Sequence, residues 1–443
     1  MTPATTSKGE SSTVVDDSPF TSFHRLLVVY ANGGLFCDGY ILSGIGVALS
    51  LLGPQMHLTT TMTGLIGAAT LLGILIGGLV FGHLTDRIGR QFMFTADLAV
   101  FVIASALQFF VSTPAELVAL RFILGLAIGA DYPIAAALLA ELAPKEQRGT
   151  MLGGTQVAWY LGACAAYVVS YALLGAGAES WRWMLASSAV PAAICLFMRF
   201  GSPESPRWLL NKGRDEEAHA TLTRLYGNAE GMAELAERTP TRFGRIFEGR
   251  YLRDVMFVGV MWLLQVTPLF AIYTFAPEVL AALHLGGQTS SVIGSLAISV
   301  FFLVGSAVGL PLLSSWGRRP LCIWSFAVAA VAFVALALVE TPLVTTVCFT
   351  VYAIAIGAAT TLELLYPSEL FPTDIRATAT GFATAVSRVG AFTGTFVLPR
   401  ALAAFGVGDI MMACAALSIC GVVLAIAFAP ETKGMSLRQA SYR

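Results

Sequence analysis

Two aspartates lie inside long apolar stretches of the sequence. Asp131 belongs to the stretch LRFILGLAIGADYPIAAALLAEL, which runs from Leu120 to Leu142, and no Lys or Arg lies within nine residues of it. Asp38 belongs to the stretch ANGGLFCDGYILSGIG. An ionisable side chain at the centre of a membrane-spanning helix costs roughly 2.5–3.5 kcal/mol, so it normally faces a cavity or a partner group. Because a carboxyl group in such a place can bind and release a proton, the sequence predicts a proton site or relay at Asp38 and Asp131.

The helical period predicts where the Asp131 side chain points. One stripe of its helix repeats every four residues and consists of Arg121, Gly125, Gly129 and Pro133. Small residues in such a stripe let a neighbouring helix approach closely. Asp131 lies about 200° around the helix from Gly129, so we expect it to face the central cavity. Two alternatives remain: Asp131 pairs permanently with an arginine of another helix, and Asp38 is a hydrogen-bonded aspartate that braces a kinked helix.

The composition shows what kind of chain holds these groups. Of the 443 residues, 56% are apolar and 12% are charged, whereas about a quarter of an average soluble domain is charged. The chain is therefore expected to be an integral membrane protein. A net charge of −1 gives no reason to expect nucleic acid, and seven scattered cysteines without ligand-like spacing predict no metal site. No H-E-x-x-H, G-x-S-x-G or phosphate-loop motif occurs, so no catalytic residues, cofactor or enzyme activity are predicted.

Apolar runs of membrane-spanning length predict an all-α membrane protein with twelve transmembrane helices. The runs lie near 26–52, 61–83, 92–112, 117–141, 150–174, 183–200, 254–280, 290–313, 320–339, 343–366, 377–400 and 408–429. An even number places both termini on one side. All four lysines and the long loop after the sixth run fall on that side, so the positive-inside rule predicts cytoplasmic termini and a multi-pass protein of the inner or plasma membrane.

The runs predict two six-helix bundles with a linker between them. The expected segments are a disordered cytoplasmic tail at 1–24, an N-terminal bundle at 25–200, a linker with short amphipathic helices at 201–252, a C-terminal bundle at 253–430 and a second tail at 431–443. We expect a monomer whose partners are the lipid bilayer, protons and a small-molecule substrate.

An internal repeat supports the division into two pseudo-symmetric bundles. DRIGR at Asp86–Arg90 has a counterpart in SSWGR at Ser314–Arg318, and ELAPKEQRGTMLG at Glu141–Gly153 matches ELFPTDIRATATG at Glu369–Gly381. Both pairs are separated by the same offset along the chain. A parallel repeat of this kind places a substrate site between the halves near the midplane.

Charged residues and glycines of the repeated loops are candidates for locking one conformation. Carboxylates and arginines at helix ends can join neighbouring helices in one state and release them in another. These candidates are Gly82, Asp86, Arg87, Gly89, Arg90, Glu141, Arg148, Gly317, Arg318, Glu369 and Arg376. Asp97, near the cytoplasmic end of the third run, is expected to belong to the same network. The alternative is that these are ordinary cytoplasmic loop charges.

Several motifs together resemble the major facilitator superfamily. They are GHLTDRIGRQ at Gly82–Gln91, RFILGLAIGADYP at Arg121–Pro133, WRWM at Trp181–Met184, PESPRWLLNKGRDEEA at Pro203–Ala218, SELFPTDIRATATG at Ser368–Gly381 and PETKG at Pro430–Gly434. The resemblance is to the sugar-porter-like and metabolite:proton symporter branches. It implies alternating access, and it matches Asp38 and Asp131 to acidic residues that phosphate symporters use for proton movement. Val266 stands where those symporters carry an aspartate, and Ser314 replaces an expected acidic residue.

Polar and aromatic residues of the predicted helices are candidates for binding the substrate. The set is Tyr132, Gln156, Trp159, Trp262, Gln265, Tyr273, Thr361, Glu363 and Arg388. Such a mixture suits a small organic metabolite with hydroxyl, carboxylate or ring groups. For each residue the alternative is packing, and for Glu363 it is also a pair with Arg388.

The sequence therefore predicts a proton-coupled symporter of a small organic metabolite, which is an organic acid, an aromatic compound or a sugar-like molecule. The alternative within the same fold is a facilitative uniporter or a proton-coupled exporter. A phosphate:proton symporter and a nutrient receptor that does not transport are less favoured.

Overall fold

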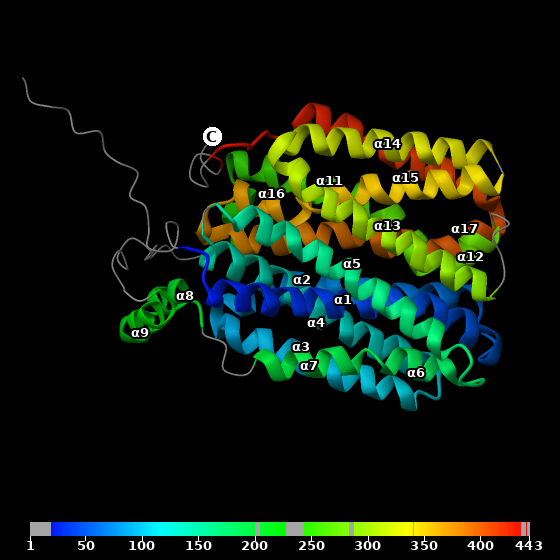
Figure 1. Cartoon of the computed structure of the whole chain (residues 1–443), viewed down its shortest axis with the longest axis horizontal. Coiled ribbons are helices and arrows are strands. Elements are labelled where there is room, and N and C mark those ends of the chain that lie inside the picture. Colours follow the sequence, from blue (N-terminus) through cyan, green and yellow to red (C-terminus); the bar gives the residue numbers. More distant parts are fainter. Residues whose placement is uncertain are drawn as a thin grey trace, which may run out of the picture.

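The helices of the protein run side by side along one long axis, as the computed structural model shows (Figure 1). The structure describes residues 19–144, 146–199, 204–226, 243–282, 288–339, 341–435 and 440, and all regular elements among them are helical. The first half contains α1 (Ser22–Gln55), α2 (Thr60–Ile88), α3 (Arg90–Leu107), α4 (Pro114–Leu142), α5 (Arg148–Leu173), α6 (Ser180–Ala186) and α7 (Ala189–Arg199).

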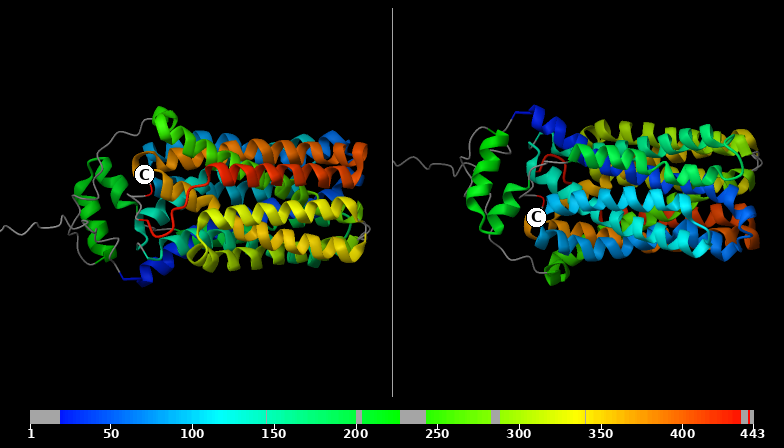
Figure 2. Two further views of the ribbon diagram at one scale, coloured as in Figure 1. Left: turned by 90° about the horizontal axis from the view of Figure 1, so that it is seen from above. Right: turned by 90° about the horizontal axis from the view of Figure 1, so that it is seen from below.

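The linker and the second half follow in the same manner. The linker carries α8 (Pro206–Asn211), α9 (Asp215–Tyr226) and a short 3-10 turn at Phe243–Phe247. The second half contains α11 (Gly249–Thr274), α12 (Ala276–Ala282), α13 (Gln288–Ser315), α14 (Arg318–Leu338), α15 (Pro342–Thr360), α16 (Leu362–Leu370) and α17 (Thr373–Phe428). In two further views, α8 and α9 lie beyond one end of the bundle (Figure 2). We call this end, where α1 begins and α17 ends, the terminus face.

The predicted twelve-helix membrane fold is confirmed. Eleven helical segments of the described residues are long and apolar enough to cross a membrane. The last of them, Ile375–Phe428, contains two helices that meet at Gly406, whose φ of 80° and ψ of 173° are not helical. Dividing it there gives twelve spans.

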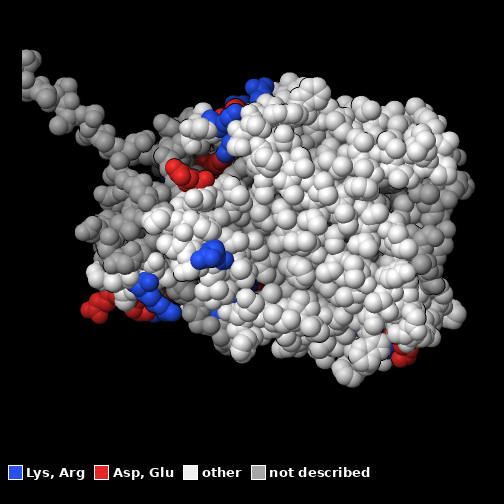
Figure 3. All heavy atoms as spheres, viewed as in Figure 1, with Lys and Arg blue, Asp and Glu red and all other residues white. Residues whose placement is uncertain are grey.

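The surface of the protein agrees with a bundle of helices that spans a membrane. The flank shown in Figure 3 carries hardly any charged side chain, and most of the charges visible in that view gather at the terminus face. Large apolar side chains point outward from the bundle, such as Phe197 at 79% exposure and Leu343 at 75%. These side chains lie where lipid tails would contact the protein.

Helix starts repeat between the halves in the same way as the loops. Thr113 accepts a hydrogen bond from the Glu116 backbone and precedes Pro114, the first residue of α4. Thr341 is its counterpart at the offset of the repeat; it precedes Pro342 and accepts a hydrogen bond from the Val344 backbone. Threonine at the cap and proline at the first position both favour a helix start, so the repeat extends to local structure.

The two halves approach each other at glycines. A β-carbon at Gly46 of α1 would overlap the carbonyl oxygen of Thr274, and one at Gly381 of α17 would lie 2.8 Å from the carbonyl oxygen of Gly78. Gly46 lies toward the face opposite the termini, whereas Gly78 and Gly381 lie toward the terminus face. The halves are therefore in close contact on both sides of the bundle centre.

Candidate substrate and proton sites

A small cavity lies between the two halves at the centre of the bundle. Its volume is about 10 Å³, which is close to the space that one water molecule needs. The lining residues are Tyr132, Gln156, Trp159, Tyr160, Val266, Leu269, Phe270, Thr360, Glu363 and Arg388. Five of the nine predicted substrate-binding candidates are among them. Residues of α4 and α5 from the first half thus meet residues of α11, α15, α16 and α17 from the second half.

Among the described residues, Arg388 is the only arginine that lines this cavity. It is 1% exposed, and its guanidinium carbon lies 5.1 Å from the ring centre of Phe270, 5.3 Å from that of Tyr132 and 5.5 Å from that of Trp262. Ring faces attract a cation without using its N–H groups. The one hydrogen bond that Arg388 donates in the described structure goes to Ser387 Oγ at 3.3 Å, and Nε has no partner. Most of its donors are therefore free to bind an acceptor.

Other unpartnered donors surround the same cavity. The Gln156 amide nitrogen and the Trp159 indole nitrogen are buried and make no hydrogen bond in the described structure. The amide nitrogen of Gln265, one turn of α11 away from Trp262, is also buried without a partner. Buried donors are rarely left unsatisfied in proteins. The arrangement therefore suits a ligand that is rich in hydrogen-bond acceptors.

Glu363 is the acidic group of the cavity. It is the second residue of α16, it is 5% exposed, and it lies close enough to Arg388 and Trp262 to interact with both. Among the described residues no ion pair within 4.0 Å joins Glu363 to Arg388. The cavity thus presents one cation and one carboxyl group that are not locked together.

Four other candidates lie near the cavity without lining it. Trp262 packs against Tyr132 with 6.3 Å between ring centres, and Gln265 is 1% exposed. The Tyr273 hydroxyl donates to Ser299 at 2.5 Å, and the Thr361 hydroxyl donates to the Ala358 carbonyl within its own helix at 2.7 Å. These two hydroxyls are therefore already bonded in this conformation.

Five residues that line the cavity are not among the candidates predicted from the sequence: Tyr160, Thr360, Val266, Leu269 and Phe270. Tyr160 and Thr360 directly adjoin the candidates Trp159 and Thr361, which is a signal that could have found them. Phe270 has no such signal, because an apolar ring in an apolar helix is indistinguishable from core packing.

Asp131 is fully buried, and it lies away from the central cavity. Its Oδ1 lies 3.6 Å from Nη2 of Arg199, the last residue of α7. A β-carbon at Gly34 of α1 would overlap the Asp131 carboxylate and contact Nη2 of Arg199. The side chain thus points into the first bundle, between α1 and α7. This differs from the direction expected from the helical period, and it matches the alternative of a pair with an arginine of another helix.

Asp97 of α3 lies beside the same arginine. Its Oδ1 is 3.5 Å from Nη1 of Arg199, and its carboxyl group comes within hydrogen-bonding reach of that of Asp131. Asp97 is 4% exposed. It therefore belongs to a buried cluster of the first bundle, and its expected place in the loop network is wrong. In the sequence, Arg199 is an ordinary charge at the terminus-side end of an apolar run, so this contact could not be predicted.

Asp38 is 0% exposed, and neither of its carboxylate oxygens has a hydrogen-bond partner in the described structure. It lies four residues beyond Gly34, which is about 6 Å along α1 toward the bundle centre. The next residue, Gly39, contacts the backbone of Trp159, which lines the central cavity. Asp38 therefore lies between the Arg199 cluster and the cavity.

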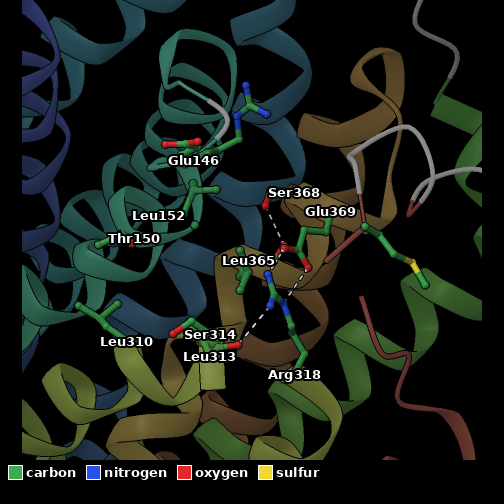
Figure 4. Close-up of a pocket in the computed structure, with 13 residues that line it drawn as sticks. Glu146, Thr150, Leu152, Leu310, Leu313, Ser314, Arg318, Leu365, Ser368 and Glu369 are labelled. Atoms are coloured by element: carbon green, nitrogen blue, oxygen red, sulfur yellow. Dashed lines mark hydrogen bonds and ion pairs between the residues drawn. The ribbon is translucent and has the colours of Figure 1, made fainter. Parts of the chain in front are cut away.

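A second cavity opens between the halves at the terminus face, and its volume is about 220 Å³. Figure 4 shows side chains of both halves along its wall, with Glu146, Thr150 and Leu152 of the first half on one side and Arg318 and Glu369 of the second half on the other. Arg318 donates to Glu369 through Nη2 at 2.7 Å and through Nε at 3.3 Å. This ion pair lies within the second half.

The repeated loops make matching contacts in both halves. Arg148 donates to the Ala143 carbonyl at 2.9 Å, and Arg376 donates to the Phe371 carbonyl at 3.2 Å. Each contact reaches back five residues, and the two arginines are counterparts at the offset of the repeat.

Glycines at two helix starts complete the correspondence. Gly89 and Gly317 have φ values of 122° and 98° and precede α3 and α14. The carboxylate of Glu204 accepts hydrogen bonds from the backbone of Arg90 and Gln91, and that of Glu431 accepts them from the backbone of Arg318 and Arg319. A carboxylate at a helix N-terminus is stabilising, so both motifs fix a helix start. The side chains of Gly82, Asp86, Arg87 and Glu141 lie outside the described part of the structure.

Comparisons with known proteins agree over nearly the whole chain. The family model described as "Sugar (and other) transporter" matches residues 10–443. The "Putative metabolite transport protein YaaU" of Escherichia coli (strain K12) is 41% identical over 428 residues, which are 96% of this chain and 96% of the relative. The "Inner membrane metabolite transport protein YgcS" of the same organism is 37% identical over 425 residues, covering 96% and 95%.

A solved structure of the proton:xylose symporter XylE, of the major facilitator superfamily and bound to 6-bromo-6-deoxy-D-glucose, has a similar fold. The TM-score is 0.83 at 23% identity, and the match covers 95% of this chain and 98% of that chain. At 23% identity, this structural similarity establishes the fold alone.

Proposed function

This chain belongs to the sugar and other transporter family of the major facilitator superfamily, and we propose that it is a proton-coupled symporter of a small organic anion. It is a multi-pass membrane transporter of metabolites, not an enzyme. The proposed features are an anionic solute and the coupling of its transport to protons. We place both termini on the cytoplasmic side and take the monomer as the working unit.

One observation carries the choice of solute. Arg388 lies at the central cavity with three aromatic rings around it, and most of its N–H groups make no hydrogen bond in the described structure. A planar guanidinium with free donors fits a carboxylate, which can accept two parallel hydrogen bonds. The free donors of Gln156 and Trp159 add capacity for further oxygens, and the rings supply faces for an apolar or planar part of the solute.

Transport by alternating access follows from the size of the cavity. At about 10 Å³ the cavity cannot hold an organic anion, so the solute enters only when the two halves move apart. The halves touch through glycines on both sides of the cavity, and each set of contacts can open in turn. Arg318 and Glu369 pair within the second half and line the opening between the halves at the terminus face, so this pair and the capped helix starts are suited to fix the shape of that opening in one state.

Proton coupling is supported by the buried carboxyl groups Asp38 and Asp131. Asp38 lies one helical turn from the Arg199 cluster and next to the residue that contacts the cavity wall. A proton bound there lowers the negative charge near the cavity at the moment an anion arrives, which gives symport a physical reason.

The test is a binding screen on purified protein followed by uptake into vesicles. We expect acids such as benzoate or gluconate to raise the melting temperature, and matched neutral compounds such as benzyl alcohol, glucose or xylose to leave it unchanged. Uptake of the binding acid should collapse when the proton gradient is dissipated. Stabilisation by the neutral compounds alone would refute an anionic solute. Uptake that survives the loss of the gradient would refute symport and leave a uniporter.

A further inference from the structure

Arg199 holds together a buried cluster with an unbalanced charge. It donates to the backbone carbonyls of Phe94 at 2.6 Å and of Tyr30 at 2.8 Å, so its strongest hydrogen bonds go to α3 and α1. The carboxylates of Asp97 and Asp131 flank it at 3.5 and 3.6 Å. All three charged side chains are at most 4% exposed. One cation therefore faces two carboxyl groups in the interior of the first bundle.

The carboxyl groups themselves have spare hydrogen-bonding capacity. Neither oxygen of Asp131 and only one oxygen of Asp97 has a hydrogen-bond partner in the described structure. If both groups were ionised, the cluster with Arg199 would carry one uncompensated negative charge in the membrane, which is costly. One bound proton makes the cluster neutral and supplies the missing hydrogen bond between the two groups, as in other carboxyl pairs that share a site.

We propose that Asp97 and Asp131 share a single proton beside Arg199 and form the terminus-side station of the proton path, from which Asp97 releases the proton toward that face. Asp38 is the station next to the cavity. The transfer moves one proton from the Asp38 carboxyl group to the Asp97–Asp131 pair, and it leaves a carboxylate at Asp38. Arg199 balances the one carboxylate that remains in the pair.

The order of the stations follows from the helices. Asp97 lies seven residues inside the terminus-side start of α3, about 10 Å from it. Asp131 touches the α1 backbone at Gly34, and Asp38 lies one turn farther toward the cavity. The proton path therefore runs from Asp38 past Asp131 to Asp97.

Titratable groups of the neighbouring helices lie close enough to this cluster to interact with its charges. Helix α1 contributes Asp38 and Cys37, and α7 contributes Cys195 along with Arg199. The two thiol sulfurs lie 3.9 Å apart. Arg388 of the second half also acts on Asp38 electrostatically. None of these groups replaces Arg199 as the cation that contacts both carboxylates.

Infrared spectroscopy of the purified protein tests the shared proton directly, without a solute. A protonated carboxyl group has a C=O stretching band that an ionised one lacks. Relative to Asp97→Asn, the parent should show one additional band that disappears on alkaline titration. The same difference should appear relative to Asp131→Asn, because either single variant leaves one carboxylate to balance Arg199 without a proton. A band that persists in both variants would overturn the proposal.

Melting temperatures provide a second readout. The melting temperature of each single variant should be close to that of the parent. In the double variant Asp97→Asn with Asp131→Asn, the melting temperature should fall by more than the sum of the two single decreases, because the buried charge of Arg199 then has no counter-charge. A large loss for Asp131→Asn with none for Asp97→Asn would mean that Arg199 pairs with Asp131 alone, and the proposal would fail.

Gly34 allows the cluster to be disturbed without removing a titratable group. The methyl group of Gly34→Ala would collide with Asp131 and Arg199, whereas that of Gly44→Ala on the same helix would meet only Ala166 at 3.9 Å. We expect Gly34→Ala to change the pH at which the carboxyl band disappears and Gly44→Ala to leave it as in the parent. An unchanged band in Gly34→Ala would show that this geometry does not hold the proton.

The role of the pair in transport rests on the proposed function, and the two can fail separately. With an acid found by the binding screen, Asp97→Asn should lose gradient-driven accumulation and keep counterflow. Accumulation by this variant would overturn the role of Asp97 while symport stands. If no acid is transported by the parent, the proposed function fails, and the infrared and melting results still decide whether the proton is shared.

Discussion

Replacing Gly317 by alanine should destabilise the second half through two separable effects. Gly317 has φ 98° and ψ 177°, a region that is essentially restricted to glycine. Forcing a side chain into such a conformation costs about 1–3 kcal/mol. A β-carbon there would also lie 2.6 Å from Oε2 of Glu431. The Arg318 backbone donates to Oε1 of this carboxylate and the Arg319 backbone donates to Oε2, at 3.1 Å each.

The second effect has the size of a lost helix cap. Displacing the Glu431 carboxylate removes the partner of two N–H groups at the start of α14, and loss of a cap costs about 0.5–2 kcal/mol. The sum for Gly317→Ala is roughly 1.5–5 kcal/mol. Gly406 is the matched control, since its φ of 80° and ψ of 173° fall in the same region and a β-carbon there meets nothing within 4 Å. Gly406→Ala should therefore cost only the strain.

The assay is reversible unfolding in mixed micelles, followed by tryptophan fluorescence. A double-mutant cycle isolates the contact: in a Glu431→Ala background, Gly317→Ala should cost no more than Gly406→Ala. Gly89→Ala in the first half, whose β-carbon would lie 2.8 Å from Oε2 of the linker residue Glu204, should behave like Gly317→Ala in the parent. Equal costs of Gly317→Ala and Gly406→Ala in the parent would refute the reasoning, because the carboxylate cap would then contribute nothing.

Four further variants address binding and gating. Arg388→Met removes two charge-assisted hydrogen bonds to a carboxylate, about 3 kcal/mol in all, so the Kd of a transported acid should rise about 100-fold in a binding titration; an unchanged Kd would show that Arg388 does not contact the solute. Asp86→Asn or Arg90→Ala should slow uptake and leave equilibrium binding nearly intact, and a loss of binding instead would contradict a gating role. Gly46→Val should prevent the halves from closing at Thr274 and stop uptake, and a cysteine introduced at Val266 of the cavity wall should then react with thiol reagents added from the face opposite the termini; normal uptake would argue that this contact does not close the site.

Most of the fold could be predicted from the sequence because lipid imposes a simple rule on it. Every backbone group in the membrane must be satisfied within its own helix, so apolar runs of sufficient length mark the spans. The constant offset between the repeated loops then assigned six spans to each half, and the capped starts at Thr113 and Thr341 show that the repeat reaches individual hydrogen bonds. The break at Gly406 is local in the same way, since only glycine adopts that conformation readily.

The site could be predicted only in part, because partners distant in the sequence decide it. Arg388 and Glu363 were visible as charges in apolar helices, and both line the cavity. The direction of Asp131 was not predictable from its own helix, because its counter-charge Arg199 lies far along the chain, at the end of α7. Side-chain period indicates a face of a helix, and it does not indicate which neighbour covers that face.

The carboxyl groups of the proposed proton path lie in the first half, and Arg388, which is proposed to bind the anion, lies in the second. Adjacent residues of α4 contact both sites. At the offset of the repeat, Asp38 corresponds to Val266, and Arg388 corresponds to Tyr160, so neither of these two buried charges is repeated in the other half. Asp131 contacts Arg199 inside the first bundle, and the next residue, Tyr132, presents its ring to Arg388 in the central cavity at 5.3 Å. Consecutive helical residues point about 100° apart, so a small rotation or shift of α4 moves both groups together. In the proposed symport, a change of protonation that alters the contact of Asp131 with Arg199 would reach the aromatic wall around Arg388 through the adjacent residue Tyr132, which would give the coupling of proton and solute a physical route.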